Sequence, residues 1–334
     1  MKLTIMGSGT SHGVPVIGCD CPVCKSEDPR DKRLRASAFV TDGKCNIVID
    51  TGPEFRIQAL RQGIKSLDAI LMTHGHADHL HGLDDIRMFS CTKQGGVWHK
   101  QTTFWDSVLG HHGGGLKVFA DSHAKKAIFS HFDYIFKKTQ KGGGKPRIDL
   151  WNINEFSEKH PLIIGSMSII PIPMMHGTLP ATGYLFMERQ KSCEISDFAE
   201  RAESVGGLKR DGEVRGGNNG GEVHSILYLT DLSYISDKSI EIINRNKGIL
   251  EHAVIDGLRV KPHSTHFGFL QTMECAQKIL PRHTWFTHMT HDMNHVDVQK
   301  YIDEHLHEFP ELERIVKDGG SVSPGYDTLE LDTE

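Results

Sequence analysis

Short apolar runs, each ended by polar residues or glycine, recur along the chain and alternate with segments of helical character. Runs of roughly four to eight apolar and β-branched residues between turn signals are typical of buried strands. We expect strands over Lys2–Met6, Asn46–Asp50, Ala69–Thr73, Leu116–Ala120, Met167–Pro173, Gly183–Met187, Ser225–Thr230, Ala253–Ile255 and Thr284–Thr287. We expect helices over Glu54–Gln62, Ser122–Lys137, Thr272–Leu280 and Asp297–Glu308. Such repeated alternation predicts a layered α/β architecture.

Two stretches interrupt this alternation without restarting it. Thr92–Gly115 contains two glycine clusters and no clear hydrophobic period, and Ser204–Glu222 is rich in glycine and charge. Segments of this composition are typical of surface excursions. The sequence therefore predicts one domain over residues 1–334, with insertions near 92–115 and 204–222, rather than two domains.

The composition argues against some functions and directs attention to histidine and cysteine. The chain of 334 residues can bury a sizeable core, and its formal net charge of −5 gives no general basic footprint for nucleic acid. It contains 22 histidines and 7 cysteines. Neither a signal-peptide core nor a run of the roughly 20 apolar residues of a membrane helix is visible. We therefore expect a cytoplasmic, reducing setting, in which clustered cysteines bind metal rather than form disulfides.

A histidine-rich segment, His74-Gly-His76-Ala-Asp78-His79, directly follows one of the expected strands. Side chains at strand ends emerge where α/β proteins usually have their sites. His74 and His76 lie two residues apart on an extended backbone, so they project the same way and can share one metal ion. Asp78 and His79 can face a second ion, because four ligands exceed what one metal normally takes from so short a segment. Two ions about 3.5–4 Å apart are typical of two-metal hydrolases.

This segment resembles the His-x-His-x-Asp-His motif of the metallo-β-lactamase superfamily, whose fold is a four-layer αββα sandwich with metals at one edge of two facing sheets. The family pattern also requires three ligands at later strand ends, and His176, Asp231 and His288 follow expected strands in the same order. The resemblance implies one ion on His74, His76 and His176, a second ion on Asp78, His79 and His288, and Asp231 bridging both. This ligand set suits Zn²⁺, Mn²⁺, Fe²⁺ or Ni²⁺, and the sequence does not choose among them.

A second candidate metal site lies nearer the N-terminus, where Cys19, Cys21 and Cys24 supply three thiolates within six residues. Structural zinc takes four Cys or His ligands, so the fourth must come from elsewhere. His291, three residues after His288, is the candidate. The cysteine spacing, the preceding Gly-Val-Pro and the paired Thr-His-x-Thr-His near the C-terminus resemble the PhnP-type phosphodiesterases, which open cyclic ribosyl phosphates in the carbon–phosphorus lyase pathway. That resemblance implies a structural zinc on Cys19, Cys21, Cys24 and His291, separate from the catalytic pair.

The catalytic residues we expect are Asp78 and His266. Two close divalent ions lower the pKa of a bridging water, and Asp78 can orient that nucleophile as well as bind metal. A leaving alkoxide also needs a proton or a positive partner. His266 aligns with a histidine that PhnP-like enzymes use near the scissile phosphate, and His263 is its rival in the same loop.

The resulting functional hypothesis is a dinuclear metal-dependent phosphodiesterase that acts on cyclic or nucleotide-like phosphodiesters by attack of a metal-bridging hydroxide. Two alternatives stay open, a ribonuclease Z-like RNA-processing endonuclease and a non-catalytic metal-binding scaffold. The expected partner is a small phosphodiester substrate, and no membrane partner is expected. Nucleic acid is a less favoured partner because of the net acidic charge of −5. Homodimer formation is left open.

Overall fold

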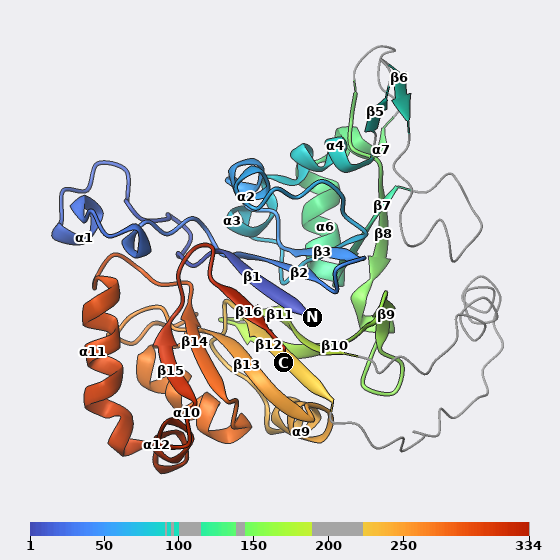
Figure 1. Cartoon of the computed structure of the whole chain (residues 1–334). Coiled ribbons are helices and arrows are strands. Elements are labelled where there is room, and N and C mark those ends of the chain that lie inside the picture. Colours follow the sequence, from blue (N-terminus) through green and yellow to red (C-terminus); the bar gives the residue numbers. More distant parts are fainter. Residues whose placement is uncertain (91, 95–96, 100–114, 138–143, 189–222, 334) are drawn as a thin grey trace.

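Two seven-stranded sheets lie face to face in the computed structural model, which describes residues 1–90, 92–94, 97–99, 115–137, 144–188 and 223–333 (Figure 1). The first sheet has the order β16(Glu330–Asp332), β1(Lys2–Gly7), β2(Ser37–Thr41), β3(Asn46–Ile49), β4(Ala69–Leu71), β7(Leu116–Ala120), β8(Ile148–Asn152). The second has the order β15(Ser321–Pro324), β14(His283–Thr287), β13(Ile249–Asp256), β12(His224–Leu229), β11(Leu179–Glu188), β10(Met167–His176), β9(Leu162–Ile164).

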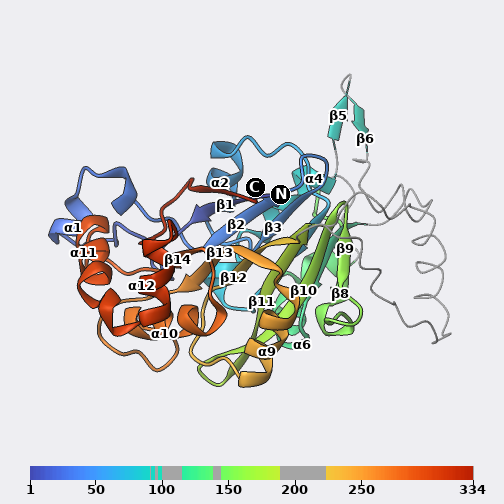
Figure 2. The ribbon, with the colours of Figure 1, turned by 60° about the horizontal axis from the view of Figure 1, so that its bottom comes forward.

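Helices cover the outer face of each sheet, as Figures 1 and 2 show from two sides. The first sheet is covered by α2(Phe55–Arg61), α3(Ala77–Leu80), α4(Arg87–Ser90), α6(Ser122–His131) and α7(Asp133–Phe136). The second sheet is covered by α9(Asp237–Asn246), α10(Phe269–Ile279), α11(His295–His305) and α12(Pro310–Lys317). The predicted four-layer αββα sandwich is therefore confirmed.

The strand β12 shows why the sheets form layers. Its side chains point alternately to the two faces of the sheet, since successive residues of a strand do so. Ile226 and Tyr228 pack into the core between the sheets, whereas Leu227 and Leu229 pack against the helices of the second sheet. Both faces are apolar because both are covered, which is why this strand reads as a continuous hydrophobic run in the sequence.

The elements differ from the predicted ones mainly in length and number. The strands β10 and β11 run to ten residues each, well beyond the predicted segments. β9 pairs only with the first residues of β10, so Pro171 and Pro173 lie beyond it, where no strand of the described residues needs their missing N–H. The helix predicted over Ser122–Lys137 is two helices, which meet at Phe132. The pattern of apolar and polar residues did not predict the short strands β2, β8, β9, β15 and β16 or the helices α9 and α12.

The two predicted insertions fall largely outside the described residues. The segment Ser204–Glu222 lies wholly outside them. Within Thr92–Gly115, the described part is mainly a hairpin of β5(Thr92–Gln94) and β6(Val97–His99). The one-domain organisation stays a prediction.

The two ends of the described chain meet beside each other on the first sheet (Figures 1 and 2). The N-terminal amine lies 2.9 Å from Thr333 Oγ1, and β16 pairs with β1. Among the described helices, none has the length and apolar character needed to cross a membrane.

Candidate metal centres

The predicted metal ligands of both sheets come together at one edge of the sandwich. His74 and His76 follow β4 of the first sheet, and α3 begins directly after them. In the second sheet His176 ends β10, Asp231 follows β12 and His288 follows β14. The side chains therefore approach one another from facing sheets, as the resemblance to the superfamily implies.

Three strand ends at this edge have an unusual backbone. Asp50, Asp231 and His288 have φ values of 59°, 56° and 60°, in the left-handed region that residues with a Cβ seldom adopt. Each such residue costs on the order of 1–3 kcal/mol and persists only where its surroundings fix it. Their concentration at one edge indicates that side-chain direction there is set by function rather than by backbone preference.

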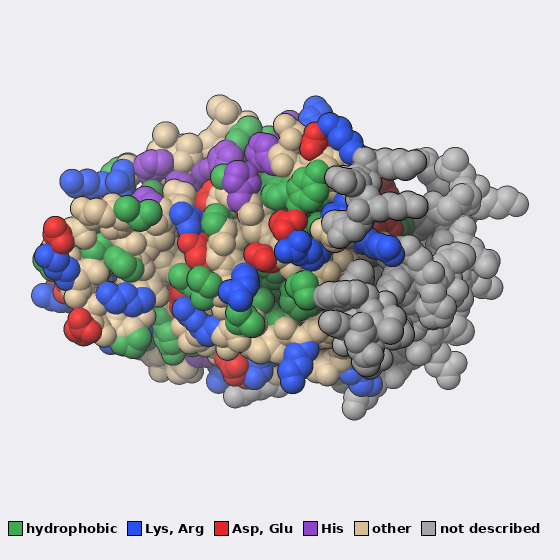
Figure 3. Space-filling view, turned by 90° about the horizontal axis from the view of Figure 1, so that it is seen from above, with side chains coloured by type: hydrophobic (Ala, Val, Ile, Leu, Met, Phe, Trp, Pro, Cys, Tyr) green, Lys and Arg blue, Asp and Glu red, His purple; other side chains and the backbone are tan. Residues whose placement is uncertain are grey.

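The expected metal ligands form two adjoining groups, and His266 lies close enough to His176 and Asp231 to be a further candidate. The first consists of His74, His76 and His176, and the second of Asp78, His79, Asp231 and His288. Within each group the candidate ligand atoms lie within 4.8 Å of one another. All are buried or half-buried except His76, which is exposed. Histidine side chains also gather in one area of the face of the molecule seen in Figure 3.

Asp231 lies between the two groups and presents one carboxylate oxygen to each. Its Oδ1 atom lies 3.9 Å from His74 Nε2 and 3.9 Å from His176 Nε2. Its Oδ2 atom lies 3.0 Å from His79 Nε2 and 3.4 Å from His288 Nε2. A carboxylate in this position can bridge two cations, one held by each group.

The nitrogen atoms at the centre of these groups fit a bound cation. Among the described residues, the Nε2 atoms of His74, His79 and His288 are buried and have no hydrogen-bond partner. His79 Nε2 lies close to Asp231 Oδ2, but the angle between the two groups does not allow a hydrogen bond. Buried polar atoms are normally paired, so a row of unpaired imidazole nitrogens beside carboxylates calls for a metal ion.

The electrostatics of the second group lead to the same conclusion. Burial raises the pKa of Asp78, but the neighbouring His79 and His288 lower it well below its usual range. Burial lowers the pKa of His79, but Asp231 and Asp50 raise it well above its usual range. Negative charge therefore dominates around His79, which would favour a divalent cation there.

Asp50, which the sequence analysis missed, orients the second group from behind. Its Oδ2 atom lies 2.7 Å from His79 Nδ1, and its carboxylate also accepts hydrogen bonds from the backbone N–H and the hydroxyl of Thr73. A hydrogen bond at Nδ1 fixes the ring and leaves Nε2 free for a metal. His176 is held in the same way by the backbone carbonyl of Thr265, 2.8 Å from its Nδ1.

His266 lies beside the two groups and is oriented by a second missed carboxylate, Asp256. The distance from His266 Nδ1 to Asp256 Oδ2 is 2.8 Å, and the backbone N–H of Leu232 donates to the same oxygen. His266 Nε2 lies 4.0 Å from Asp231 Oδ1. Burial raises the pKa of Asp256 and lowers that of His266, so the pair favours a neutral state with one shared proton. His263, the rival in the same loop, is exposed.

Asp50 and Asp256 could have been found from a signal already in the sequence. Asp50 directly follows β3, and Asp256 is the last residue of β13, so each comes at the end of an apolar run. An aspartate in that position is usually a turn residue, so the pattern alone does not separate the functional ones from the others.

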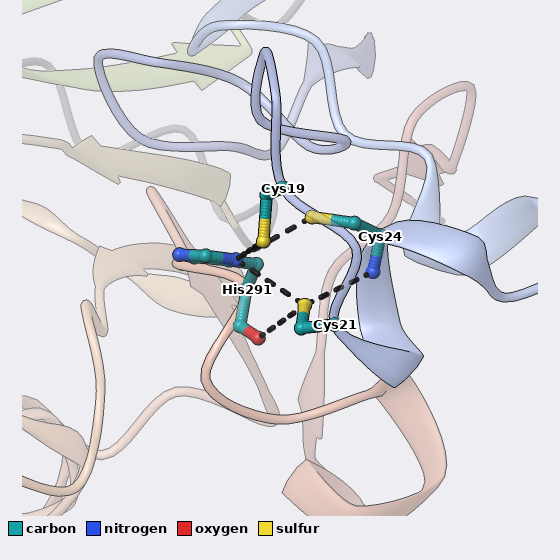
Figure 4. Close-up of side chains that lie close together, drawn as sticks. All are labelled: Cys19, Cys21, Cys24 and His291. Atoms are coloured by element: carbon teal, nitrogen blue, oxygen red, sulfur yellow. Dashed lines mark hydrogen bonds between the residues drawn. The ribbon is translucent and has the colours of Figure 1, made fainter.

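The three cysteines and His291 form a compact group that shares no residue with the groups around Asp231 (Figure 4). The Sγ atoms of Cys19, Cys21 and Cys24 each lie 3.4 Å from His291 Nδ1. Tetrahedral zinc with bonds of about 2.3 Å to sulfur and 2.0–2.1 Å to nitrogen requires nearly this separation. The backbone N–H of Cys24 is the main cause that lowers the pKa of the Cys21 thiol to about 6, which favours the thiolate that zinc binds.

A short segment links the cysteine group to the catalytic edge. His288 and His291 are three residues apart, and the backbone of Met289 between them pairs with the loop after β1. Met289 N–H donates to Ser8 O, and Thr10 N–H donates to Met289 O. The buried guanidinium of Arg33 donates to the carbonyl of Thr290. A metal at the cysteine group would therefore hold the segment that carries His288.

Comparison with known proteins adds a family and several relatives. The model of the Beta-lactamase superfamily domain matches residues 45–289. The crystal structure of a new diphosphatase from the PhnP family is 31% identical, with a TM-score of 0.68, over 100% of this chain and 98% of that one. Human tRNase Z, short form, covers 100% of both chains with 12% identity and a TM-score of 0.54, a likeness of fold alone.

A curated relative matches over a smaller region. The octanoyltransferase of Porphyromonas gingivalis is 37% identical over 210 residues, which are 63% of this chain and 37% of that protein. The chain thus spans little more than a third of the length of that relative.

Replacing Asp50 by asparagine should weaken metal binding at the second group by about 10–100-fold, because an amide orients the His79 ring less firmly than a carboxylate. Competition with a chelator for Mn²⁺ or Zn²⁺ measures the affinity, and circular dichroism checks the fold. Asp42→Asn is the matched control, since Asp42 also accepts several hydrogen bonds but serves a turn before Cys45. Equal metal affinity of the two variants would count against a role for Asp50.

Replacing Cys21 by serine should remove about one zinc ion per chain, because a hydroxyl is a poor ligand in a site built for thiolates. Elemental analysis of the purified protein measures the loss, and catalytic activity should fall with it. Cys275→Ser is the control, because Cys275 is buried on α10 and belongs to no candidate metal group among the described residues. Unchanged zinc in Cys21→Ser would overturn the assignment of this site.

Proposed function

The chain belongs to the metallo-β-lactamase superfamily as a PhnP-like member, and we propose that this hydrolase is a metal-dependent phosphodiesterase. The observation that carries the proposal is His266. It lies next to both metal groups, and Asp256 holds its Nδ1 side so that Nε2 faces them. A group of this kind suits a reaction in which an oxygen leaves with negative charge.

The two metal groups would hold a divalent ion each, with Asp231 shared between them. Bound ions of this kind lower the pKa of water to near neutrality and stabilise charge on phosphoryl oxygens. The protein side chains fix the spacing of the two positions. Asp50, Thr73 and Thr265 hold the imidazole rings so that their Nε2 atoms converge.

His266 and Asp256 would act on the leaving oxygen. In this role His266 Nε2 donates its proton to that oxygen, and Nδ1 takes up the proton that the imidazole shares with Asp256. The burial of Asp256 keeps this interaction strong, because the local dielectric is low.

The names of the relatives leave two other substrates to test. The PhnP-family relative of 31% identity is called a diphosphatase, which favours a phosphoanhydride as the second candidate. The 12% identity to human tRNase Z supports a common fold and no common substrate. The name octanoyltransferase belongs to a protein of which the match covers 37%, so that activity is not carried over.

Hydrolysis of bis-(p-nitrophenyl) phosphate by the protein loaded with Mn²⁺ or Zn²⁺ tests the proposal. We expect release of p-nitrophenol that a chelator abolishes, and hydrolysis of cyclic phosphodiesters in preference to a nucleoside diphosphate and to precursor tRNA. A preference for the diphosphate would replace the phosphodiesterase by a diphosphatase, and one for precursor tRNA would favour RNA processing. Activity on none of them would favour a metal-binding scaffold.

Replacing His266 by alanine should lower kcat on a phosphodiester by about 10²–10⁴-fold, the usual contribution of a positioned proton donor. Metal content should not change, since His266 is not a ligand in the proposed arrangement. Steady-state kinetics and elemental analysis of the same preparation measure both quantities. His263→Ala, in the same loop but exposed, is the control and should be less than about tenfold impaired. Loss of a metal ion from His266→Ala would make His266 a ligand instead.

A further inference from the structure

A buried ion pair lies between the loop of the three cysteines and the segment that carries His291. The side chain of Arg33 is fully buried and that of Asp31 nearly so, and Arg33 Nη2 lies 3.3 Å from Asp31 Oδ1. Charged side chains are rarely buried, because the cost of removing them from water offsets much of their attraction. A buried ion pair is therefore weak evidence for stability, and its other contacts indicate what it does.

The arginine of this pair holds the backbone on both sides of His291. Nη1 of Arg33 donates to the carbonyl of Thr290, and Nη2 donates to the carbonyl of Met293 at 3.1 Å. These two residues precede and follow His291 in the sequence. The guanidinium is a rigid planar group with several donors, so two carbonyls bound to it are fixed relative to each other. Arg33 thus sets the course of the chain around the expected zinc ligand.

The aspartate of the pair holds the cysteine loop. Ser26 directly follows the helix α1(Pro22–Lys25), which contains Cys24. The hydroxyl of Ser26 donates to Asp31 Oδ2 at 2.6 Å. The other oxygen, Oδ1, accepts the backbone N–H of His295 at 2.6 Å, where the helix α11 begins. One carboxylate therefore connects the helix of the cysteines to the chain that follows His291.

These contacts join the two halves of the cysteine group through protein atoms alone. None of them uses a cysteine Sγ atom or the ring of His291, which are the atoms that would bind a metal. The backbone of Arg33 also exchanges two hydrogen bonds of 2.8 Å with Val14, in the loop before the cysteines. Figure 4 shows the cysteines and His291 facing one another from segments far apart in the sequence. Hydrogen bonds that a metal does not supply thus place the four side chains.

We propose that Asp31 and Arg33 are positioning residues that assemble the cysteine group before a metal ion binds to it. The inference rests on the assignment of a metal site to the cysteine group and does not depend on the proposed phosphodiesterase reaction. A preassembled site binds its ion without first ordering two segments, so less of the binding free energy is lost. It differs in this from small zinc domains, which fold only when the metal binds.

Titration of the metal-depleted protein with Co²⁺ tests this role. A chelator sets the free Co²⁺ concentration, and the thiolate-to-cobalt absorption band reports binding at the cysteine group alone, because the groups around Asp231 contain no sulfur. Arg33→Lys keeps a positive charge opposite Asp31 but loses the paired donors that reach both carbonyls. We expect its Co²⁺ affinity to be about 10–100-fold lower, the usual loss when a residue that supports a metal ligand is replaced. Absence of the band in the wild-type protein would overturn the metal site and this role with it.

Two further variants keep the test decisive if Arg33→Lys does not fold. Ser26→Ala leaves the ion pair intact but releases α1 from Asp31, and it should bind Co²⁺ about three- to tenfold more weakly. Arg30→Lys is the control, because Arg30 donates to Asp28 in the same loop rather than to the segment of His291. Its affinity should change by less than about twofold. The proposal is overturned if either of the first two variants, when folded, binds Co²⁺ as tightly as the control.

Hydrogen exchange of the metal-free protein measures the assembly directly. The amides of Val14, Arg33 and His295 donate across the joined segments and should be protected in the wild-type protein without metal. In Arg33→Lys they should exchange at least about tenfold faster, whereas the amide of Val254 on β13 should not change. Rapid exchange of the three amides in the metal-free wild-type protein, or unchanged exchange in Arg33→Lys, would contradict the proposal. Neither measurement involves turnover, so the phosphodiesterase can fail while this role stands, and the reverse.

Discussion

A backbone hydrogen bond of 2.9 Å, from Thr182 N–H to Thr73 O, joins the two sheets at the edge where the metal-binding side chains gather. Thr73 precedes the histidine-rich segment of the first sheet, and Thr182 lies on β11 of the second. Beside it, the buried hydroxyl of Tyr184 donates to Met72 O at 2.6 Å. Each metal group draws side chains from both sheets, so their convergence depends on this fixed spacing. The apolar core between the sheets cannot supply it alone, because hydrophobic burial is not directional.

The convergence of buried carboxylates and imidazoles at this edge is electrostatically unfavourable unless a cation binds between them. Asp231 and Asp50 are fully buried, and several imidazoles with unpaired Nε2 atoms surround Asp231. Buried charges without partners are strongly destabilising, so this arrangement favours a bound cation. Such a site is stabilised by a divalent ion, and its left-handed residues at Asp231 and His288 show that the backbone is shaped for the ligands rather than for its own stability.

Local patterns predicted the layers and the histidine-rich segment, whereas the later candidate ligands His176, Asp231 and His288 were expected from the resemblance to the superfamily. Apolar runs indicate the covered strands, and the segment from His74 to His79 places four possible metal ligands within six residues. The short edge strands such as β16 and β9 escaped, since three residues carry too little periodicity to be distinguished from a loop. Asp256 escaped for another reason. Its role depends on the position of His266, ten residues away, and only the folded loop brings the two together.

One short segment joins the two candidate metal sites. β14 ends at Thr287, and the segment that follows belongs to no strand. Within five residues it carries His288, whose backbone is left-handed, and His291 of the cysteine group. It ends at Asp292, whose carboxylate lies near Arg259. A left-handed residue persists only where its surroundings over-determine it. The loop after β1 supplies part of that restraint through the hydrogen bonds of Met289, and a metal bound by His291 would add to it from three residues away. A metal at the cysteine group would then support His288 as well as the loop that carries the cysteines.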